Sequence, residues 1–141
     1  MLFRSKQIVA AIHAAGGHAV GLSGKDAQLI EAAKLTRSRR DPGSNIEQVL
    51  DLGFVGQPVR IRTEVLDVFA KTEIVPVIAP IGLGADGHTY NINADTAAGA
   101  IAAALHARKL VLLTDVPGVL DGEGRLISEL TASTARSCAA P

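Results

Sequence analysis

The alanine-rich stretch at residues 94–107 constrains the fold more strongly than any other part of the sequence. It reads ADTAAGAIAAALHA, and alanine is the best helix former, so it predicts a helix from Asp95 to Ala107. Side chains this small allow a helix to pack closely on a sheet. Apolar residues make up 48% of the chain but aromatic residues only 3%. The core must therefore be aliphatic, which suits an α/β domain whose parallel strands are buried on both faces.

Hydrophobic periodicity and glycine or proline punctuation predict the other elements. Helices are expected at residues 6–15 and at residues 63–70, the second with Thr63 as its cap. Strands are expected at residues 18–23, 73–81 and 109–114, with a polar loop at residues 37–44. Residues 47–53 and 54–58 carry strand-like alternation that is broken by glycines. The stretch AQLIEAAKL (residues 27–35) fits either a helix or a hairpin strand.

This order of elements implies right-handed crossovers and a mainly parallel sheet within one domain of 141 residues. In such sheets ligands bind beyond the carboxyl ends of the strands, beside helix N-termini.

Charge and cysteine content limit the classes of partner. The formal net charge is zero, whereas a protein that binds nucleic acid normally has a basic excess. The single cysteine, Cys138, excludes an internal disulfide and fits a reducing compartment. No apolar run approaches the ~18 residues of a membrane span, and MLFRSKQ lacks the pattern of a signal peptide. We therefore expect a cytoplasmic protein with no nucleic-acid partner and no membrane association. The histidines show no metal-ligand spacing, so no protein metal site is expected.

Residues 82–87 (GLGADG) match the pattern G-x-G-x-x-G directly after an expected strand. A dinucleotide-binding fingerprint also requires that a helix begin at once. Here HTYNI follows with the alternation of an extended segment, which favours a glycine-rich hairpin with its tip at residues 85–87. No phosphate-binding P-loop pattern occurs in the sequence.

Three polar residues, Asn91, Asn93 and Asp95, stand immediately before the alanine-rich helix. Asp95 can cap that helix, a role worth about 1 kcal/mol. A cap does not explain Asn91 and Asn93, which alternate on one face of an extended segment. The spacing leaves two interpretations open, a helix cap alone or a ligand site.

Two further segments are candidates for binding. The run TDVPGVLD (residues 114–121) follows an expected strand and is either a plain turn or a loop that contacts nucleotide. The basic residues Lys34, Arg37, Arg39 and Arg40 form either a solvated loop or a site for phosphate or an acidic partner.

The stretch PVIAPIGLGADGHTYNINADTAAGAIAAALHARKLVLLTDVPGVLD (residues 76–121) resembles the acetylglutamate kinases of the amino acid kinase family. The runs KQIVAAIHAAGGHAVGLSGKD and RRDPGSNIEQVLDLGFVGQP are similar to the same family, so the resemblance extends over about residues 6–131. The combination of N-I-N-A-D, an alanine-rich helix and L-L-T-D-V-P-G-V is far more specific than a glycine motif alone.

The resemblance implies a three-layer αβα sandwich with a mainly parallel sheet, incomplete at both ends. It implies transfer of the γ-phosphoryl group of ATP, with Mg²⁺, to the side-chain carboxylate of N-acetyl-L-glutamate in arginine biosynthesis, and a homo-oligomer in the intact enzyme. Asn91 matches the asparagine that binds acetylglutamate, and Asp95 matches the catalytic aspartate that organises the catalytic lysines. The first ATP-contacting loop corresponds to Asp115, Val116, Pro117, Gly118, Val119 and Leu120.

Two parts of the family pattern have no counterpart in this sequence, and each carries a catalytic lysine. We therefore expect the isolated chain to be inactive. One alternative is a non-catalytic α/β module that binds a nucleotide or an acylamino acid. Another is a kinase for aspartate, a nucleoside monophosphate or carbamate, although N-I-N-A-D favours acetylglutamate.

Overall fold

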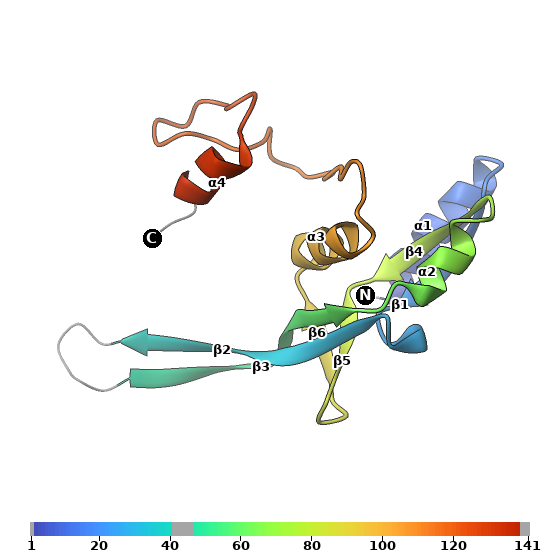
Figure 1. The fold of residues 1–141 in the computed structure, drawn as a ribbon, viewed down its shortest axis with the longest axis horizontal. Helices are drawn as coiled ribbons and strands as arrows, with labels where there is room; N and C mark the ends of the chain where they lie inside the picture. The colour runs from blue at the N-terminus through green and yellow to red at the C-terminus, as the bar shows by residue number, and fades with distance from the viewer. Residues whose placement is uncertain (1, 41–46, 139–141) are drawn as a thin grey trace. The chain divides into compact units, whose positions relative to one another are not determined.

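The computed structural model describes residues 2–40 and 47–138. The chain divides into two compact units, Met1–Leu110 and Val111–Pro141. The first unit combines helices with strands that include parallel pairs, which confirms the predicted α/β class (Figure 1). In chain order its elements are α1 (Leu2–Ala14), β1 (His18–Ser23), the 3-10 helix η1 (Asp26–Gln28), β2 (Ile30–Arg40), β3 (Glu47–Ile61), α2 (Glu64–Phe69), β4 (Ile74–Ala79), β5 (Ile81–Gly84), β6 (Thr89–Ile92) and α3 (Ala94–Ala104).

Strands β1 and β4 form a parallel two-stranded sheet, in register from His18 opposite Ile74 to Ser23 opposite Ala79. Helix α1 packs against both strands. The bounds of β1 are those predicted, and α1 begins four residues earlier than expected. The strand expected at residues 73–81 is divided at Pro80 into β4, which pairs with β1, and β5, which pairs with β2 and β6.

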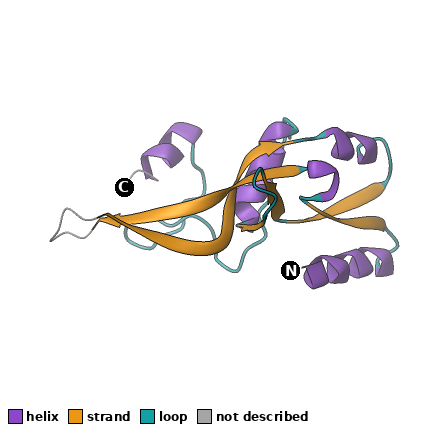
Figure 2. Cartoon of the chain, turned by 90° about the horizontal axis from the view of Figure 1, so that it is seen from below, coloured by secondary structure: helices purple, strands orange, loops and turns teal. Residues whose placement is uncertain are grey.

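The other four strands form a small closed barrel in the order β2-β3-β6-β5. The β2–β3 and β5–β6 pairs are antiparallel, whereas β2–β5 and β3–β6 are parallel. The described strands thus pair in both directions, although the sequence predicted a mainly parallel sheet. Figure 2 shows β2 and β3 as a long hairpin.

The β2–β3 pairing settles the ambiguous stretch at residues 27–35, which continues from η1 into β2 rather than forming an α-helix. Strand β2 extends to Arg40, so the prediction of a loop at residues 37–44 is wrong for residues 37–40. Residues 41–44 lie outside the described residues. The basic residues Arg37, Arg39 and Arg40 therefore belong to a strand and not to a loop.

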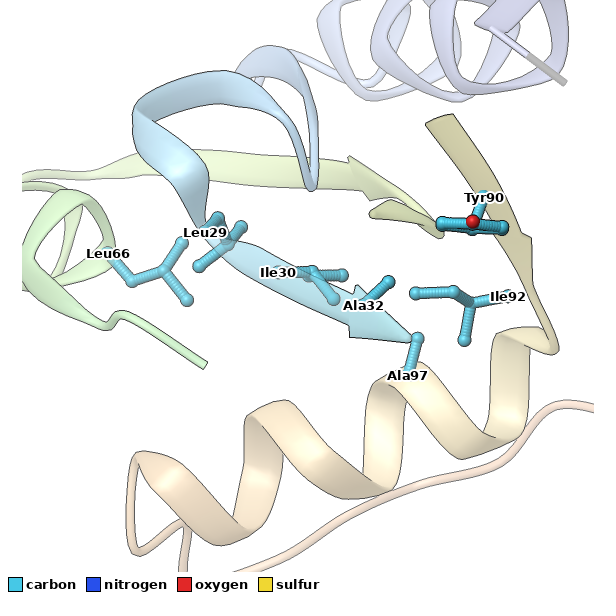
Figure 3. Packing of buried hydrophobic residues seen from close by; sticks show 7 residues of the cluster. All are labelled: Leu29, Ile30, Ala32, Leu66, Tyr90, Ile92 and Ala97. Atoms are coloured by element: carbon cyan, nitrogen blue, oxygen red, sulfur yellow. The ribbon is translucent and has the colours of Figure 1, made fainter. Parts of the chain in front are cut away.

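A small aliphatic cluster holds the barrel, the 3-10 segment and the two flanking helices together (Figure 3). Tyr90 is the one aromatic residue in the cluster, and Ile92 lies between the barrel and α3. Its buried members are Leu29, Ile30, Ala32, Leu66, Tyr90, Ile92 and Ala97. The alanine-rich helix thus packs on the barrel through a small side chain, as the sequence suggested.

The second unit has little regular structure. It contains the helix α4 (Ala132–Cys138) and an isolated antiparallel bridge between Leu120 and Leu126. The strand expected at residues 109–114 is wrong, because a strand requires a neighbour for its backbone hydrogen bonds and no described strand pairs with this segment. The side chain of Leu113 is 95% exposed. Among the helices of residues 2–40 and 47–138, none is both long enough and apolar enough to cross a membrane.

Candidate functional site

The G-x-G-x-x-G segment forms β5 and the turn that joins it to β6, as predicted. Gly84 N–H donates to the His88 carbonyl at 2.8 Å, and Gly87 N–H donates to the Gly84 carbonyl at 2.9 Å. Gly87 has φ +80°, a left-handed conformation that glycine adopts without steric cost. An antiparallel hairpin follows β5 in place of a helix, so this segment does not form a dinucleotide-binding turn.

Strand β6 presents Asn91 to solvent, and Asn93 follows directly after the strand. Tyr90 and Ile92 are buried, with 3% and 1% of their surface exposed, whereas Asn91 and Asn93 are exposed. Within β6 this alternation follows from the period of two in a β-strand, and Asn93, which is exposed as well, is the residue between β6 and α3. The backbone of Asn91 is paired with Val55 of β3 and Ile81 of β5. Asn91 is therefore a solvent-facing side chain on a strand supported from both sides.

The N-terminus of α3 is capped by Asn93, so the predicted cap at Asp95 is wrong. The Asn93 Oδ1 atom accepts from the Thr96 backbone N–H at 3.0 Å and from the Thr96 hydroxyl at 3.2 Å. An N-cap side chain bonds N–H groups two or three residues ahead, and Asn93 stands at that distance from Thr96. Asp95 lies exposed in the first turn of α3, where the helix dipole favours negative charge.

The structure thus brings Asn91, Asn93 and Asp95 together in one short segment at the junction of β6 and α3. Asn91 and Asp95 remain exposed, and Asn93 has a structural role as the cap. The turn after β1 reaches the start of the same strand, because Lys25 Nζ donates to Thr89 Oγ1 at 2.9 Å. The sequence contains Lys25 in a glycine turn after a strand, a pattern that carried no specific prediction.

A hydrogen-bonded group of side chains on the β5–β6 hairpin was not predicted from the sequence. The Tyr90 hydroxyl donates to Asp86 Oδ2 at 2.5 Å, and the His88 backbone N–H donates to Asp86 Oδ1 at 3.0 Å. His88 Nδ1 lies 3.4 Å from Asp86 Oδ2. The Phe54 ring lies over this group, with centroids 5.8 Å from His88 and 6.4 Å from Tyr90. The spacing D-x-H-x-Y across a turn was the available signal.

The contacts of this group shift two pKa values. The Tyr90 hydroxyl, followed by the His88 backbone N–H, lowers the pKa of Asp86 below 3.8. The Asp86 carboxylate, followed by burial, raises the pKa of Tyr90 above 10.0. Both shifts have the same cause, since the hydrogen bond requires a carboxylate and a neutral phenol. A cleft of about 280 Å³ opens beside the group and is lined by Lys34, Gly53, Phe54, Asp86, His88 and Tyr90.

The loop at residues 115–120 belongs to the second unit and is irregular, with bends at residues 115, 116 and 118. Ile127 N–H donates to the Val119 carbonyl at 2.9 Å, next to the Leu120–Leu126 bridge. Gly118 has φ +142°, and all six residues are exposed. A nucleotide-contacting role for this loop stays a prediction.

The chain matches the model of the amino acid kinase family over residues 1–140, and it belongs to that family.

Its curated relatives include acetylglutamate kinases. The chain is 64% identical to the enzyme of Rhodospirillum centenum over 132 residues, which cover 94% of the chain and 43% of that enzyme. It is 60% identical to the enzyme of Gluconobacter oxydans over 131 residues, which cover 93% of the chain and 44% of that enzyme. The chain therefore spans less than half the length of these relatives.

The fold also matches a solved structure. The crystal structure of smu.665 from Streptococcus mutans UA159 superposes with a TM-score of 0.74 at 29% sequence identity. The match covers 94% of the chain and 49% of that protein.

Proposed function

We propose that this chain is a portion of an acetylglutamate kinase, which transfers the γ-phosphoryl group of ATP to the side-chain carboxylate of N-acetyl-L-glutamate. The observation that carries the proposal is the 64% identity to an acetylglutamate kinase over 94% of the chain. In the reaction a carboxylate oxygen attacks the γ-phosphorus, the bond to the β,γ-bridging oxygen breaks, and ADP leaves as an acyl phosphate forms. We assign this step to arginine biosynthesis in the cytoplasm, as the similarity to acetylglutamate kinases implies.

The junction of β6 and α3 supplies two residues for this reaction. The exposed amide of Asn91 would bind the acetylglutamate acceptor, and its strand is paired on both sides. Asp95 would hold the ammonium groups of catalytic lysines close to the phosphoryl group. Phosphoryl transfer depends on positioning and on stabilisation of charge, so a carboxylate that holds lysines in place suits this chemistry. Residues 115–120 would contact ATP.

Mg²⁺ would accompany the nucleotide rather than bind a preformed protein cluster. Within the described part of the chain, no three histidine, cysteine, aspartate or glutamate side chains gather as metal ligands. Phosphate oxygens are the usual ligands of Mg²⁺ in kinases. The intact enzyme, which we expect to be a homo-oligomer, would perform the full reaction.

The direct test is ADP release by the purified 141-residue chain with Mg-ATP, comparing N-acetyl-L-glutamate with aspartate and UMP. We expect little release from the isolated chain, because the family segments with both catalytic lysines have no counterpart in it. The same assay on a chimera, in which residues 6–131 replace the matching part of the Rhodospirillum centenum enzyme, should restore release that depends on N-acetyl-L-glutamate.

The outcomes separate the alternatives. Activity of the chimera with a different acceptor would contradict the assignment to acetylglutamate. A chimera that folds and binds ligand without turnover would favour a non-catalytic binding module. Release by the isolated chain would confirm the acceptor and show that the missing lysine segments are dispensable.

A further inference from the structure

The exposure of Asn91 depends on the register of β6. A slip by one residue would turn Asn91 toward the core and Tyr90 toward solvent, since successive side chains of a strand point to opposite faces. Strand β6 has only four residues, so few ladder bonds hold it. Its register must therefore be fixed by the two side chains that it buries, Tyr90 and Ile92.

Tyr90 occupies a space that two glycines leave open. A Cβ atom on Gly56 of β3 would lie 2.6 Å from the Tyr90 Cβ, and a Cβ atom on Gly84 of β5 would lie 2.5 Å from the Tyr90 Cε2. Both distances are far below van der Waals contact. Only glycine allows the tyrosine this close to β3 and β5, so its position relative to both strands is fixed by steric fit.

The Tyr90 hydroxyl adds a second constraint along the hairpin. It bonds to Asp86, which also accepts from the His88 N–H in the turn. Tyr90, which packs against both neighbouring strands, thereby joins the turn to β6. The Ile92 N–H, two residues further on, donates to the Pro80 carbonyl at 2.9 Å and reports whether this register is kept.

We propose that Tyr90 is a positioning residue that, anchored by Asp86, holds β6 in the register that presents Asn91 to the acceptor. The inference rests on the proposed function for the acceptor's identity, whereas the register itself is independent of it. Tyr90 touches no substrate in this proposal. It acts through the backbone of the residue that follows it.

The test uses the 141-residue chain and its Tyr90→Phe variant, which keeps the ring and removes the hydroxyl. Amide hydrogen exchange at Ile92 measures opening of β6, and the amides of the β1–β4 ladder give the internal reference. We expect exchange at Ile92 to accelerate about tenfold relative to that reference, as for loss of a hydrogen bond to a charged group. Affinity for N-acetyl-L-glutamate, followed by NMR titration, should fall by a similar factor.

Two further variants make the test decisive. Phe54→Leu changes an exposed ring beside Tyr90 and keeps the Tyr90–Asp86 hydrogen bond, and should leave exchange at Ile92 within about twofold. Asp86→Ala removes the same hydrogen bond by changing an exposed residue, and it should accelerate exchange at Ile92 as much as Tyr90→Phe does. If Tyr90→Phe fails to fold, Asp86→Ala provides the measurement in its place.

Equal acceleration at Ile92 and in the β1–β4 ladder, or none at either, would overturn the proposal, since Tyr90 would then affect only overall stability. If the unaltered chain binds no N-acetyl-L-glutamate, the proposed function is contradicted for this chain. In that case, exchange at Ile92 relative to the β1–β4 ladder still tests whether Tyr90 holds β6 in its register.

Discussion

At the scale of single residues, Asp95 is the group on which the proposed transfer depends most. It is exposed and does not cap α3, because Asn93 does. Replacing the matching aspartate by asparagine in an intact relative should therefore lower turnover by about 10²–10³, the usual loss for one stabilising electrostatic group, while leaving the fold in place. Steady-state ADP release and circular dichroism would measure the two effects. Near-normal turnover would show that the carboxylate does not organise the lysines.

The hydrogen bond between Tyr90 and Asp86 predicts how stability depends on pH. The pKa of Asp86 is lowered, so its contribution is present above pH 3.8 and is lost as the pH falls through the folded-state pKa. The pKa of Tyr90 is raised, so its contribution is present below pH 10.0 and is lost as the pH rises through the folded-state pKa. The difference in unfolding free energy between the unaltered chain and Tyr90→Phe should therefore shrink at acidic pH and again at alkaline pH.

Denaturant unfolding across this pH range measures that difference. The chain contains one tyrosine and no tryptophan, so the ultraviolet absorbance of phenolate reports on Tyr90 alone. In Asp86→Ala the phenolate should appear at lower pH than in the unaltered chain. An identical titration in both would contradict the hydrogen bond.

At the scale of elements, the start of α3 combines a structural and a proposed functional role in neighbouring residues. Asn93→Ala removes the cap and should lower the free energy of unfolding by about 1 kcal/mol, measured by urea denaturation. Asn91→Ala is the matched control, because Asn91 is an exposed asparagine two residues before the cap, and its replacement should cost much less. Equal losses would mean that the cap contributes nothing specific.

The loop at residues 115–120 depends on the conformation of Gly118. Its φ is +142°, and a Cβ atom there would lie 2.9 Å from Leu126 Cδ1. Gly118→Val should therefore distort the loop and weaken ATP binding by about tenfold, in line with the usual cost of a strained backbone, measured by calorimetry. Gly122→Ala, which meets no atom within 4 Å, is the control. Unchanged ATP affinity in Gly118→Val would favour the interpretation that this loop is a plain turn that does not contact nucleotide.

At the scale of the whole molecule, sequence patterns were most reliable where the pattern is local. The bounds of β1 and the alternating exposure of Tyr90 and Asn91 follow from the period of a strand. The stretch at residues 27–35 was ambiguous because its alanine and leucine content favours a helix, whereas pairing with β3 decides its structure. Residues 109–114 have the composition of a strand but no partner among the described strands.

In the site, too, features that depend on neighbouring residues could be predicted from the sequence, whereas features that depend on distant residues could not. Exposure of Asn91 was predictable from alternation, and the resemblance supplied its proposed role. The network around Tyr90 was not predictable, because it requires the turn to bring Asp86 back to the tyrosine. It also requires Gly56, on a strand far away in the chain, to leave room for the ring.

The β1–β4 sheet has a further consequence for the order in which the chain can assemble. The whole of β2, β3 and α2 lies between its two strands in the chain, whereas the strands of the β2–β3 hairpin are neighbours. Pairings between distant segments form slowly, because a long loop must close before any contact compensates for the lost entropy. During synthesis β1 must remain without its partner until β4 leaves the ribosome, and the hairpin should already be folded by then.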